Sequence, residues 1–342
     1  MNLKQLSGIL GLSQTTVSRA LNGYPEVNEA TRLRIEQAAK QFGYHPSTRA
    51  KGLATGQALA IGHVIPMYGN SEIVNPIFGD FIAGAGEIYA QNGYEMILSM
   101  AQDQTEESIY RGLKSRRSVD GVVVHGPRMN DTRINLLQEI GLPFVVHGRA
   151  SDVTTDYAWL DVNNRRGFER ATNLLCDLGH QRIALINGYE YMDFAHRRLD
   201  GFRDAMRARG LPIDPDLLRS GEMTEDIGHQ SARDMLALSD PPSAFLTSSM
   251  ISAMGVRRAI EEAGLKMGQD VSVVTHDDAL SYLRNGTDVP IFTAIRSSVR
   301  EAGRQLAAML IAQIRDPEAG VQQKLLEAEL VIGQSTGPAP DR

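Results

Sequence analysis

The N-terminal part of the chain contains the stretch Leu12-Ser13-Gln14-Thr15-Thr16-Val17-Ser18-Arg19-Ala20-Leu21-Asn22. Three of its apolar residues have the i, i+3, i+4 spacing that places side chains on one face of an α-helix: Val17, Ala20 and Leu21. The opposite face carries only residues with hydrogen-bonding groups: Thr15, Ser18, Arg19 and Asn22. The pattern therefore predicts an amphipathic helix. We expect Ser13 to cap its N-terminus, without a capping box because Thr16 stands where Glu or Gln would be needed.

A second short helix is predicted just before this stretch, with apolar residues at helical spacing ahead of Gly11: Leu3, Leu6, Ile9 and Leu10. Two short helices joined by a tight turn with glycine have the form of a helix-turn-helix, whose second helix fits the major groove of DNA. An ordinary helical hairpin with a polar outer face fits the pattern as well. Residues 29–42 predict a third helix, which ends before Pro46.

Charge is unevenly distributed along the chain. Residues 1–56 contain seven Lys or Arg and three Glu, a net charge of +4, whereas the other 28 basic and 38 acidic side chains give −10. A basic N-terminal unit on an acidic body would concentrate attraction for phosphates on one small surface. The overall charge of −6 therefore does not argue against a nucleic-acid partner.

Composition excludes several other classes of protein. The chain has 342 residues, 42% of them hydrophobic, and a mean hydropathy of −0.23, as expected for two or three globular domains. Neither a membrane-spanning run nor an apolar export signal is evident, so a cytoplasmic location is expected. The single cysteine, Cys176, and the eight His show no metal-binding spacing, and Gly84-Ala85-Gly86 lacks the third glycine of a dinucleotide loop. We predict no cofactor, no metal and no enzymatic activity.

From residue 60 onward, short apolar strands alternate with amphipathic helices, which predicts an α/β body of parallel sheets covered on both faces. In the first half, strands are expected at 60–66, 95–100, 121–125 and 144–147, with helices at 78–92, 105–115 and 132–140 between them. The alternation starts again near residue 165, so we expect two lobes. Ligands of such sheets bind outside the carboxyl ends of the strands, which here should face a shared cleft.

Particular motifs along the whole chain resemble those of the LacI/GalR family of bacterial transcription regulators. The N-terminal motifs are Thr16-Val17-Ser18-Arg19-Ala20-Leu21-Asn22-Gly23, Val27-Asn28-Glu29-Ala30-Thr31-Arg32 and Phe42-Gly43-Tyr44-His45-Pro46. Leu178-Gly179-His180 and Val271-Ser272-Val273-Val274-Thr275-His276-Asp277-Asp278 follow in the family's order and spacing. Each motif alone is weak, but their succession is specific.

The resemblance implies a sequence-specific DNA-binding regulator with a helix-turn-helix headpiece and a two-lobed body like a periplasmic binding protein. Repression is the default expectation for such a regulator. The resemblance implies that operator DNA is bound by these positions: Gln14, Thr15, Thr16, Ser18, Arg19, Asn22, Asn28, Thr31 and Leu53. Leu53 would wedge into the minor groove from a hinge that becomes helical on the DNA. The implied partners are a palindromic double-stranded operator, a sugar effector and a second copy of the chain, with a tetramer as an open alternative.

The resemblance also implies a sugar-binding cleft between the lobes. Its candidate residues are Tyr68, Asn75, Phe78, His147, Phe194, Arg198, Met223, Ser249, Asp277 and Val299. A guanidinium at Arg198 and a carboxylate at Asp277 suit the hydroxyls of a polyol. The chain departs from the family at His147-Gly148-Arg149, at Ser249-Met250, at Asn163-Asn164 and in a longer loop before Asn75-Pro76. Val146-His147-Gly148-Arg149 and the long loop before Asn75-Pro76 resemble regulators of α-glucoside uptake and use, and the identity of the sugar stays open.

The expected domains are a headpiece at 1–46, a hinge at 47–58, a two-lobed body at 59–333 and a mobile tail at 334–342. Lobe 1 is expected at 59–160 and 292–323, and lobe 2 at 161–291 and 324–333. One alternative is a sugar solute-binding protein, which would share the body but would need an export signal and have no use for residues 1–56. An enzyme is the other, and a turnover assay would reveal it.

Overall fold

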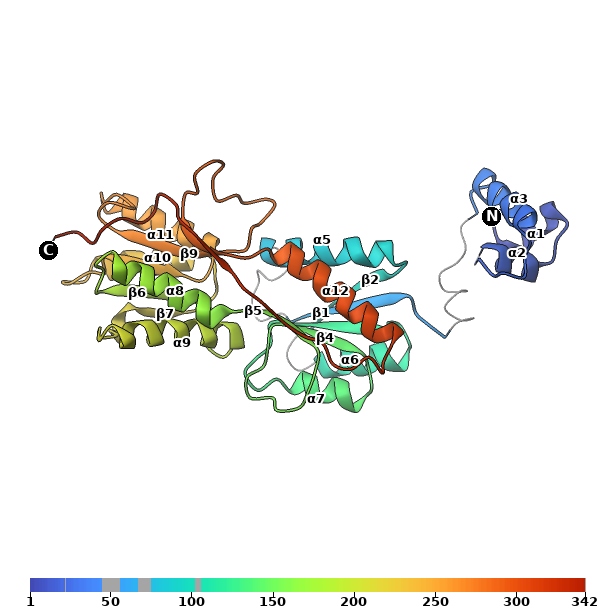
Figure 1. Cartoon of the computed structure of the whole chain (residues 1–342), viewed down its shortest axis with the longest axis horizontal. Helices are drawn as coiled ribbons and strands as arrows, with labels where there is room; N and C mark the ends of the chain where they lie inside the picture. The colour runs from blue at the N-terminus through green and yellow to red at the C-terminus, as the bar shows by residue number, and fades with distance from the viewer. Residues whose placement is uncertain (22, 45–55, 67–74, 102–105, 342) are drawn as a thin grey trace. The chain divides into compact units, whose positions relative to one another are not determined.

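The computed structural model describes residues 1–341 except 22, 45–55, 67–74 and 102–105 (Figure 1). It contains two compact units, and each is described by itself below. One unit comprises Met1–Leu59 together with Arg117–Val119, and the other comprises Ala60–Arg116 and Asp120–Arg342.

In its described residues the first unit contains three helices, which we call the headpiece: α1 (Leu3–Leu10), α2 (Gln14–Leu21) and α3 (Glu29–Gln41). The polar stretch quoted first forms α2, and Ser13 caps it as predicted, since its Oγ accepts a hydrogen bond from the Thr16 N–H at 3.0 Å. The buried core of the headpiece is Leu6, Leu10, Val17, Ala20, Val27, Ile35, Ala38 and Ala39. Ile9, which the sequence pattern places on the apolar face of the first helix, is instead 54% exposed.

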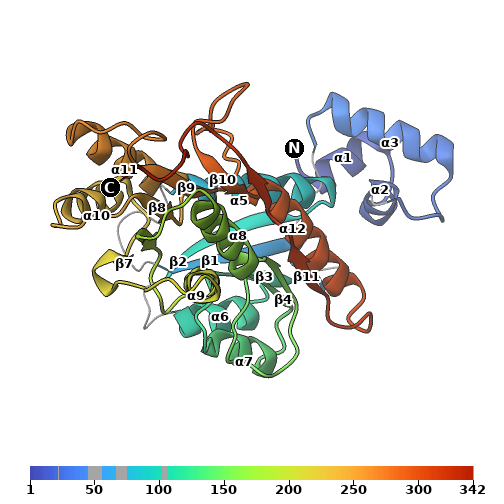
Figure 2. The same cartoon turned by 60° about the vertical axis from the view of Figure 1, so that its left-hand side comes forward.

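The second unit contains two six-stranded sheets. The first sheet has the strand order β11-β5-β4-β3-β1-β2, with all neighbours parallel. Its strands are β1 (Ala60–Pro66), β2 (Glu95–Ala101), β3 (Gly121–His125), β4 (Phe144–His147), β5 (Trp159–Val162) and β11 (Gln323–Leu326). Figures 1 and 2 show α5 (Pro76–Gln91) and α12 (Val299–Arg315) on one face and α6 (Glu106–Ser115) and α7 (Thr132–Glu139) on the other. We call this layered part lobe 1.

The second sheet has the order β12-β10-β9-β8-β6-β7, parallel except for the β10–β12 pair. Its strands are β6 (Ile183–Asn187), β7 (Leu218–Ser220), β8 (Ala244–Thr247), β9 (Ser272–Asp277), β10 (Thr293–Arg296) and β12 (Glu329–Val331), and a 3-10 turn η1 (Pro215–Leu217) precedes β7. Helices α8 (Asn164–Asp177) and α9 (Asp193–Ala208) pack over one core, and α10 (Glu225–Leu236) and α11 (Met250–Glu262) over another. We call this part lobe 2.

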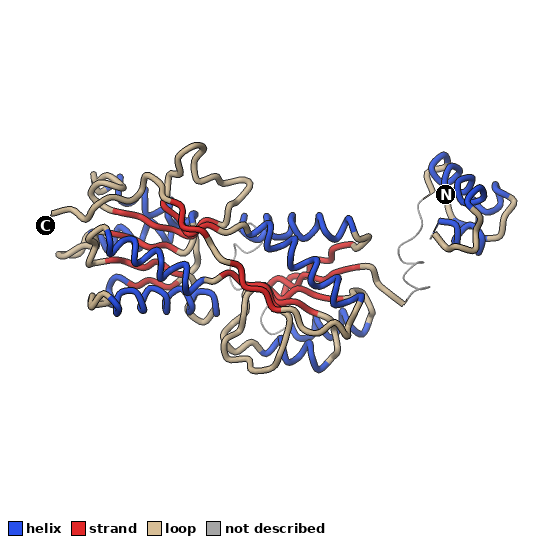
Figure 3. The backbone as a smooth tube through the Cα atoms, viewed as in Figure 1, coloured by secondary structure: helices blue, strands red, loops and turns tan. Residues whose placement is uncertain are grey.

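The chain passes between the lobes three times, which Figure 3 shows as strands continuing from one layer into the other. It leaves lobe 1 after β5, returns between β10 and α12, and leaves again between β11 and β12. The predicted lobe boundaries are therefore wrong near the C-terminus. β10 belongs to lobe 2 rather than lobe 1, and β11 joins lobe 1, because the segment that reads as one strand at 324–331 is two strands in different sheets. The strand β5 was not predicted.

The tail predicted to be mobile instead makes hydrogen bonds to lobe 2 through residues 335–339. Ser335 is fully buried, and its Oγ accepts a hydrogen bond from the Thr293 N–H at 2.8 Å while donating to the Val273 carbonyl. The Ala339 N–H donates to the Leu178 carbonyl at 2.8 Å. A turn-rich composition favours mobility, but here the polar groups of the tail bond backbone groups at the N-terminal ends of β9 and β10.

Gly84, part of the Gly-Ala-Gly run considered for a dinucleotide loop, serves the packing of α5 against α12. A Cβ at Gly84 would lie 2.0 Å from the Arg300 carbonyl oxygen, and one at Gly303 would lie 2.3 Å from that of Phe81. The two glycines therefore let the helix backbones approach each other directly.

Candidate functional site

The exposed face of α2 presents a polar surface. Gln14, Thr15 and Arg19 are exposed, and Thr16 and Ser18 are half-buried. Asn22 and Leu53 lie outside the described residues. Among the other positions predicted to contact DNA, Asn28 has a structural task, because its Oδ1 caps α3 by accepting a hydrogen bond from the Thr31 N–H at 2.8 Å.

A cavity of about 460 Å³ lies in the second unit at the carboxyl ends of strands from both lobes. Ile65, His125 and His147 line it from lobe 1, and Gly188, Ser248, Asp278 and Ser297 follow strand ends of lobe 2. We call it the interlobe cavity. Its position confirms the expectation that strand ends of both lobes meet at one site, and its volume is within the range of about 300–1,000 Å³ usual for small-molecule sites.

Arg198 is the buried cation of the lobe 2 wall. Its Nε donates to Asn164 Oδ1 at 2.8 Å and its Nη1 to the Ser248 carbonyl at 2.7 Å. The guanidinium lies 5.0 Å from the ring centres of both Phe168 and Phe194, in cation–π geometry. Burial lowers the pKa of Arg198 to about 10, so it stays charged at neutral pH. Two nitrogens of Arg198 thus bond to the protein and fix the orientation of the guanidinium at the cavity wall.

Three histidines form the lobe 1 wall and the layer behind it. His63 Nδ1 lies 2.9 Å from His125 Nε2, and His63 Nε2 lies 3.0 Å from the Tyr89 hydroxyl. His147 stacks on Phe81 at 4.3 Å, and its ring centre is 6.0 Å from that of His125. Burial lowers the pKa of His63 to about 3, that of His147 to about 4 and that of His125 well below its usual value. All three imidazoles are therefore neutral at pH 7.

Acidic groups also line the cavity. Asp161 accepts a hydrogen bond from Arg149 Nε at 2.8 Å, and burial raises its pKa. Asp278 directly follows β9, and its Oδ1 lies 3.3 Å from His276 Nε2. A polar ligand here meets hydrogen-bond acceptors as well as the donors of Arg198.

Seven of the predicted effector residues line the interlobe cavity: Asn75, Phe78, His147, Phe194, Arg198, Met223 and Val299. Tyr68 lies outside the described residues. Ser249 and Asp277 do not line the cavity, so these two predictions need correction. The Ser249 hydroxyl caps α11 by accepting from the Ser252 N–H at 3.1 Å, and Asp277 accepts from the Ala279 N–H at 2.8 Å.

The two corrections have one cause. Adjacent side chains at a strand end point in opposite directions, so a one-residue error moves a side chain out of the cavity. Ser248 and Asp278 take the places predicted for Ser249 and Asp277. Sequence reasoning also missed His125, although it ends the predicted strand at 121–125, and it missed Asn164, Tyr189 and Tyr191. His125 could have been identified, because ligands bind at the carboxyl ends of parallel strands. The two tyrosines lie in a loop whose sequence has no pattern that marks a binding site.

Carboxylates of both lobes make direct contacts across the junction near this cavity. Asp193 at the start of α9 accepts a hydrogen bond from the Ser151 N–H at 2.7 Å and from Arg197 Nε at 2.5 Å. Ser281, in the β9–β10 connection, donates from its N–H and Oγ to the carboxylate of Asp80 on α5, each at 2.7 Å. Any change in the lobe arrangement must alter these contacts.

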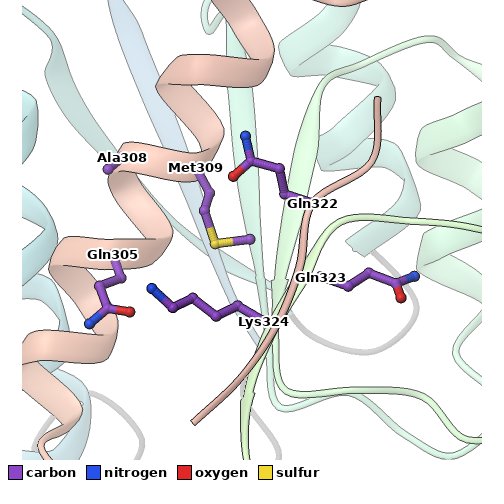
Figure 4. Close-up of a pocket in the computed structure, with 6 residues that line it drawn as sticks. All are labelled: Gln305, Ala308, Met309, Gln322, Gln323 and Lys324. Atoms are coloured by element: carbon purple, nitrogen blue, oxygen red, sulfur yellow. The ribbon is translucent and has the colours of Figure 1, made fainter. Parts of the chain in front are cut away.

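A second hollow lies between α12 and the segment before β11 (Figure 4). Its lining consists mainly of long polar side chains, Gln305, Gln322, Gln323 and Lys324, around Met309. It lacks the convergent buried charges of the interlobe cavity. Within the described ranges, no group of three or more His, Cys, Asp and Glu residues could hold a metal ion, and no helix is long and apolar enough to cross a membrane.

Comparison with known proteins agrees with both parts of this arrangement. A family model described as "Bacterial regulatory proteins, lacI family" matches residues 9–47, and one described as "Periplasmic binding protein-like domain" matches residues 172–336. The HTH-type transcriptional regulator AglR of Rhizobium meliloti (strain 1021) is 44% identical over 345 residues, which cover 100% of this chain and 96% of that protein.

Solved structures give the same result. The transcriptional regulator CelR–cellobiose complex has 26% sequence identity and a TM-score of 0.72, covering 98% of this chain and 99% of that one. The lac repressor dimer bound to operator and the anti-inducer ONPF has 25% identity and a TM-score of 0.84, with the same coverage. The protein is therefore a DNA-binding transcriptional regulator rather than an enzyme. The chain belongs to the lacI family of bacterial regulatory proteins, as the sequence motifs indicate.

Proposed function

We propose that the protein is a repressor of carbohydrate-utilisation genes whose affinity for its operator is controlled by a sugar bound in the interlobe cavity. The observation that carries this proposal is the cavity itself, which places the rigid Arg198 fork among aromatic rings at the junction of two lobes. The relation to AglR and the likeness to CelR bound to cellobiose support a sugar as the ligand. The sequence departures at His147 and in the loop before Asn75 favour an α-glucoside.

The cavity chemistry suits such a ligand. Arg198 supplies donors to sugar oxygens, and Asp161 and Asp278 supply acceptors for hydroxyl groups. Phe78 and Phe194 provide flat apolar surface for the faces of a sugar ring. Ser249 and Asp277, which point elsewhere, are no longer part of the proposed site.

The switch would act through the lobe arrangement. A ligand that contacts both lobes favours the arrangement in which its affinity is higher, and only that difference can move the equilibrium for DNA binding. Such coupling is typically about 1–3 kcal/mol and reciprocal, so operator and sugar must alter each other's affinity by the same factor. The Ser151–Asp193 and Asp80–Ser281 contacts are among the contacts between the lobes that such a change would alter.

We further propose a cytoplasmic homodimer that binds a palindromic operator through 1–46. Residues 47–58 would act as a hinge with Leu53 in the minor groove, and the two-lobed body at 59–333 would carry the effector site and the dimer contacts, its lobes bounded as the sheets define them. Bases would be read mainly by Gln14, Thr15 and Arg19, with Ser18 and Asn22 on phosphates. Leu53→Ala should then reduce the bend of operator DNA without changing sugar affinity.

A thermal-shift screen with maltose, sucrose, trehalose and cellobiose tests the ligand class, since a ligand that binds only the folded protein raises its Tm by mass action. We expect an α-glucoside to give the largest shift and Arg198→Ala to abolish it. Arg207→Ala, an exposed position on the same helix, is the matched control and should keep the shift. If no sugar shifts Tm, or if Arg198→Ala keeps the full shift, the proposed site is wrong.

Operator titrations with and without the best sugar test the regulatory role. The operator is expected to lie near sugar-utilisation genes, and saturating sugar should change its affinity by about 5- to 150-fold. Equal operator affinity in both conditions would contradict allosteric control. Sugar binding without any specific DNA binding would favour the alternative of a solute-binding protein.

A further inference from the structure

Behind the lobe 1 wall of the interlobe cavity, three side chains form a buried hydrogen-bonded series. Tyr89 on α5 is 1% exposed and His63 on β1 is 0% exposed, and neither lines the cavity. His63 links the Tyr89 hydroxyl, at 3.0 Å, to His125 Nε2, at 2.9 Å. Of these three described residues, only His125 lines the cavity.

The direction of the hydrogen bonds in this series follows from counting protons. A neutral imidazole has one N–H, so His63 donates through one nitrogen and accepts through the other. If Tyr89 accepted from His63, its own hydroxyl proton would be buried without an acceptor among the described residues, and such a group costs about 1–3 kcal/mol. Tyr89 therefore donates to His63 Nε2. His63 must then carry its proton on Nδ1 and donate it to His125.

The same proton counting determines the tautomer of His125. Because its Nε2 accepts from His63, the single proton of the neutral ring is on Nδ1. The described residues provide no hydrogen-bond partner for Nδ1. The Nδ1–H is therefore unpaired within the described part of the protein, and its ring lines the cavity. The neutral state of all three groups agrees with the lowered pKa values of both histidines.

We propose that Tyr89 and His63 are positioning residues for effector recognition: they hold His125 as the Nδ1–H tautomer, so that the lobe 1 wall offers a neutral donor to the ligand. An effector that fills this side of the cavity must place an oxygen acceptor, such as a hydroxyl or a ring oxygen, against His125. A ligand with only a donor group there would meet a second donor and bind weakly. This inference rests on the proposed function for its ligand, but the state of the histidines is a property of the protein alone.

The tautomers are measured by nitrogen NMR of the full chain labelled with ¹⁵N-histidine and free of ligand at pH 7.5, since protonated and unprotonated ring nitrogens differ in chemical shift. We expect His63 and His125 both to be protonated at Nδ1. Protonation of either ring at Nε2 would overturn the proposal. The measured tautomers do not depend on whether any sugar binds. A failed sugar screen would therefore contradict the proposed function without changing this result.

Tyr89→Phe removes the hydroxyl that sets the direction and keeps the ring. We expect the nitrogen shifts of His63 and His125 to move towards a mixture of tautomers. Tyr110→Phe is the matched control, because Tyr110 is also fully buried in lobe 1 but its hydroxyl donates to Glu106 instead. Unchanged histidine shifts in Tyr89→Phe, or equal changes in both variants, would contradict the role of Tyr89.

Sugar affinity provides the functional readout, using whichever of maltose, sucrose, trehalose and cellobiose gives the largest thermal shift. One hydrogen bond contributes about 0.5–1.5 kcal/mol, so Tyr89→Phe should weaken binding by about 2- to 10-fold. Tyr110→Phe should bind as the unaltered protein does. A mixed tautomer with unchanged affinity would show that His125 does not contact the ligand.

Discussion

Acidification should destabilise the body of this protein through its buried histidines. A histidine with a folded-state pKa below its unfolded value of 6.5 binds its proton more readily in the unfolded chain. Its contribution to stability is therefore complete above pH 6.5 and is lost as the pH falls towards the folded-state pKa. The pKa is about 3 for His63 and about 4 for His147. Each histidine should therefore lower the free energy of unfolding by about 2 kcal/mol between pH 7 and pH 5.

Urea unfolding at pH 7, 6 and 5, followed by the fluorescence of the single tryptophan, Trp159 on β5, measures this loss. Other groups also titrate, so the decisive comparison is with His63→Gln. Between pH 6 and pH 5 the variant should lose about 1.2 kcal/mol less than the unaltered protein. Phe81→Leu, which alters packing beside His147 without removing a titratable group, should lower stability equally at every pH. Parallel curves for His63→Gln and the unaltered protein would refute the reasoning.

Three further predictions follow from particular contacts. Gly84→Ala should lower the free energy of unfolding by about 1–3 kcal/mol, because the new Cβ overlaps a carbonyl of α12. Gly79→Ala on the same helix meets nothing within 4 Å and should not destabilise the protein. Measuring the Tm of both variants tests this prediction. Ser335→Ala should lower the free energy of unfolding in urea by about 1–3 kcal/mol, because it removes the hydrogen bonds to the Thr293 N–H of β10 and the Val273 carbonyl of β9. An unchanged urea midpoint would contradict the packed tail. Arg19→Ala should remove about 1–3 kcal/mol of preference at one operator base pair, measured by titration of operator variants, and equal losses on all variants would assign Arg19 to the phosphate backbone.

The helices and most strands could be predicted because their cause is local. The stripe of Val17 and Ala20 is buried as the spacing indicates, and the strand at 121–125 forms as an entirely buried β3. The topology near the C-terminus could not be predicted, because strand assignment there depends on pairing across the whole chain. Gln323–Leu326 pairs with β5, more than 150 residues earlier in sequence, and no local pattern encodes that choice.

The candidate site was predicted at the level of strand ends rather than individual side chains. Arg198 and His147 were identified because they lie at positions that family motifs mark, and both line the interlobe cavity. Ser249 and Asp277 were each displaced by one residue, since sequence alone does not reveal which of two neighbours at a strand end turns inward. The series from Tyr89 to His125 joins three separate elements, and only the folded arrangement brings them together.

The three passages between the lobes have a consequence for biosynthesis. A ribosome releases residues 60–162 early, but the edge of β5 has no neighbour on that side until Gln323–Leu326 emerges. The sheet that contains β6 is likewise incomplete until Glu329–Val331 pairs with β10. Domains with strictly consecutive chains can fold one after another during synthesis, whereas here lobe 1 cannot be completed until after nearly all of lobe 2 has been made. The edge of β5 therefore stays unpaired while the residues between β5 and β11 are made, and the nascent chain needs protection from aggregation during that period.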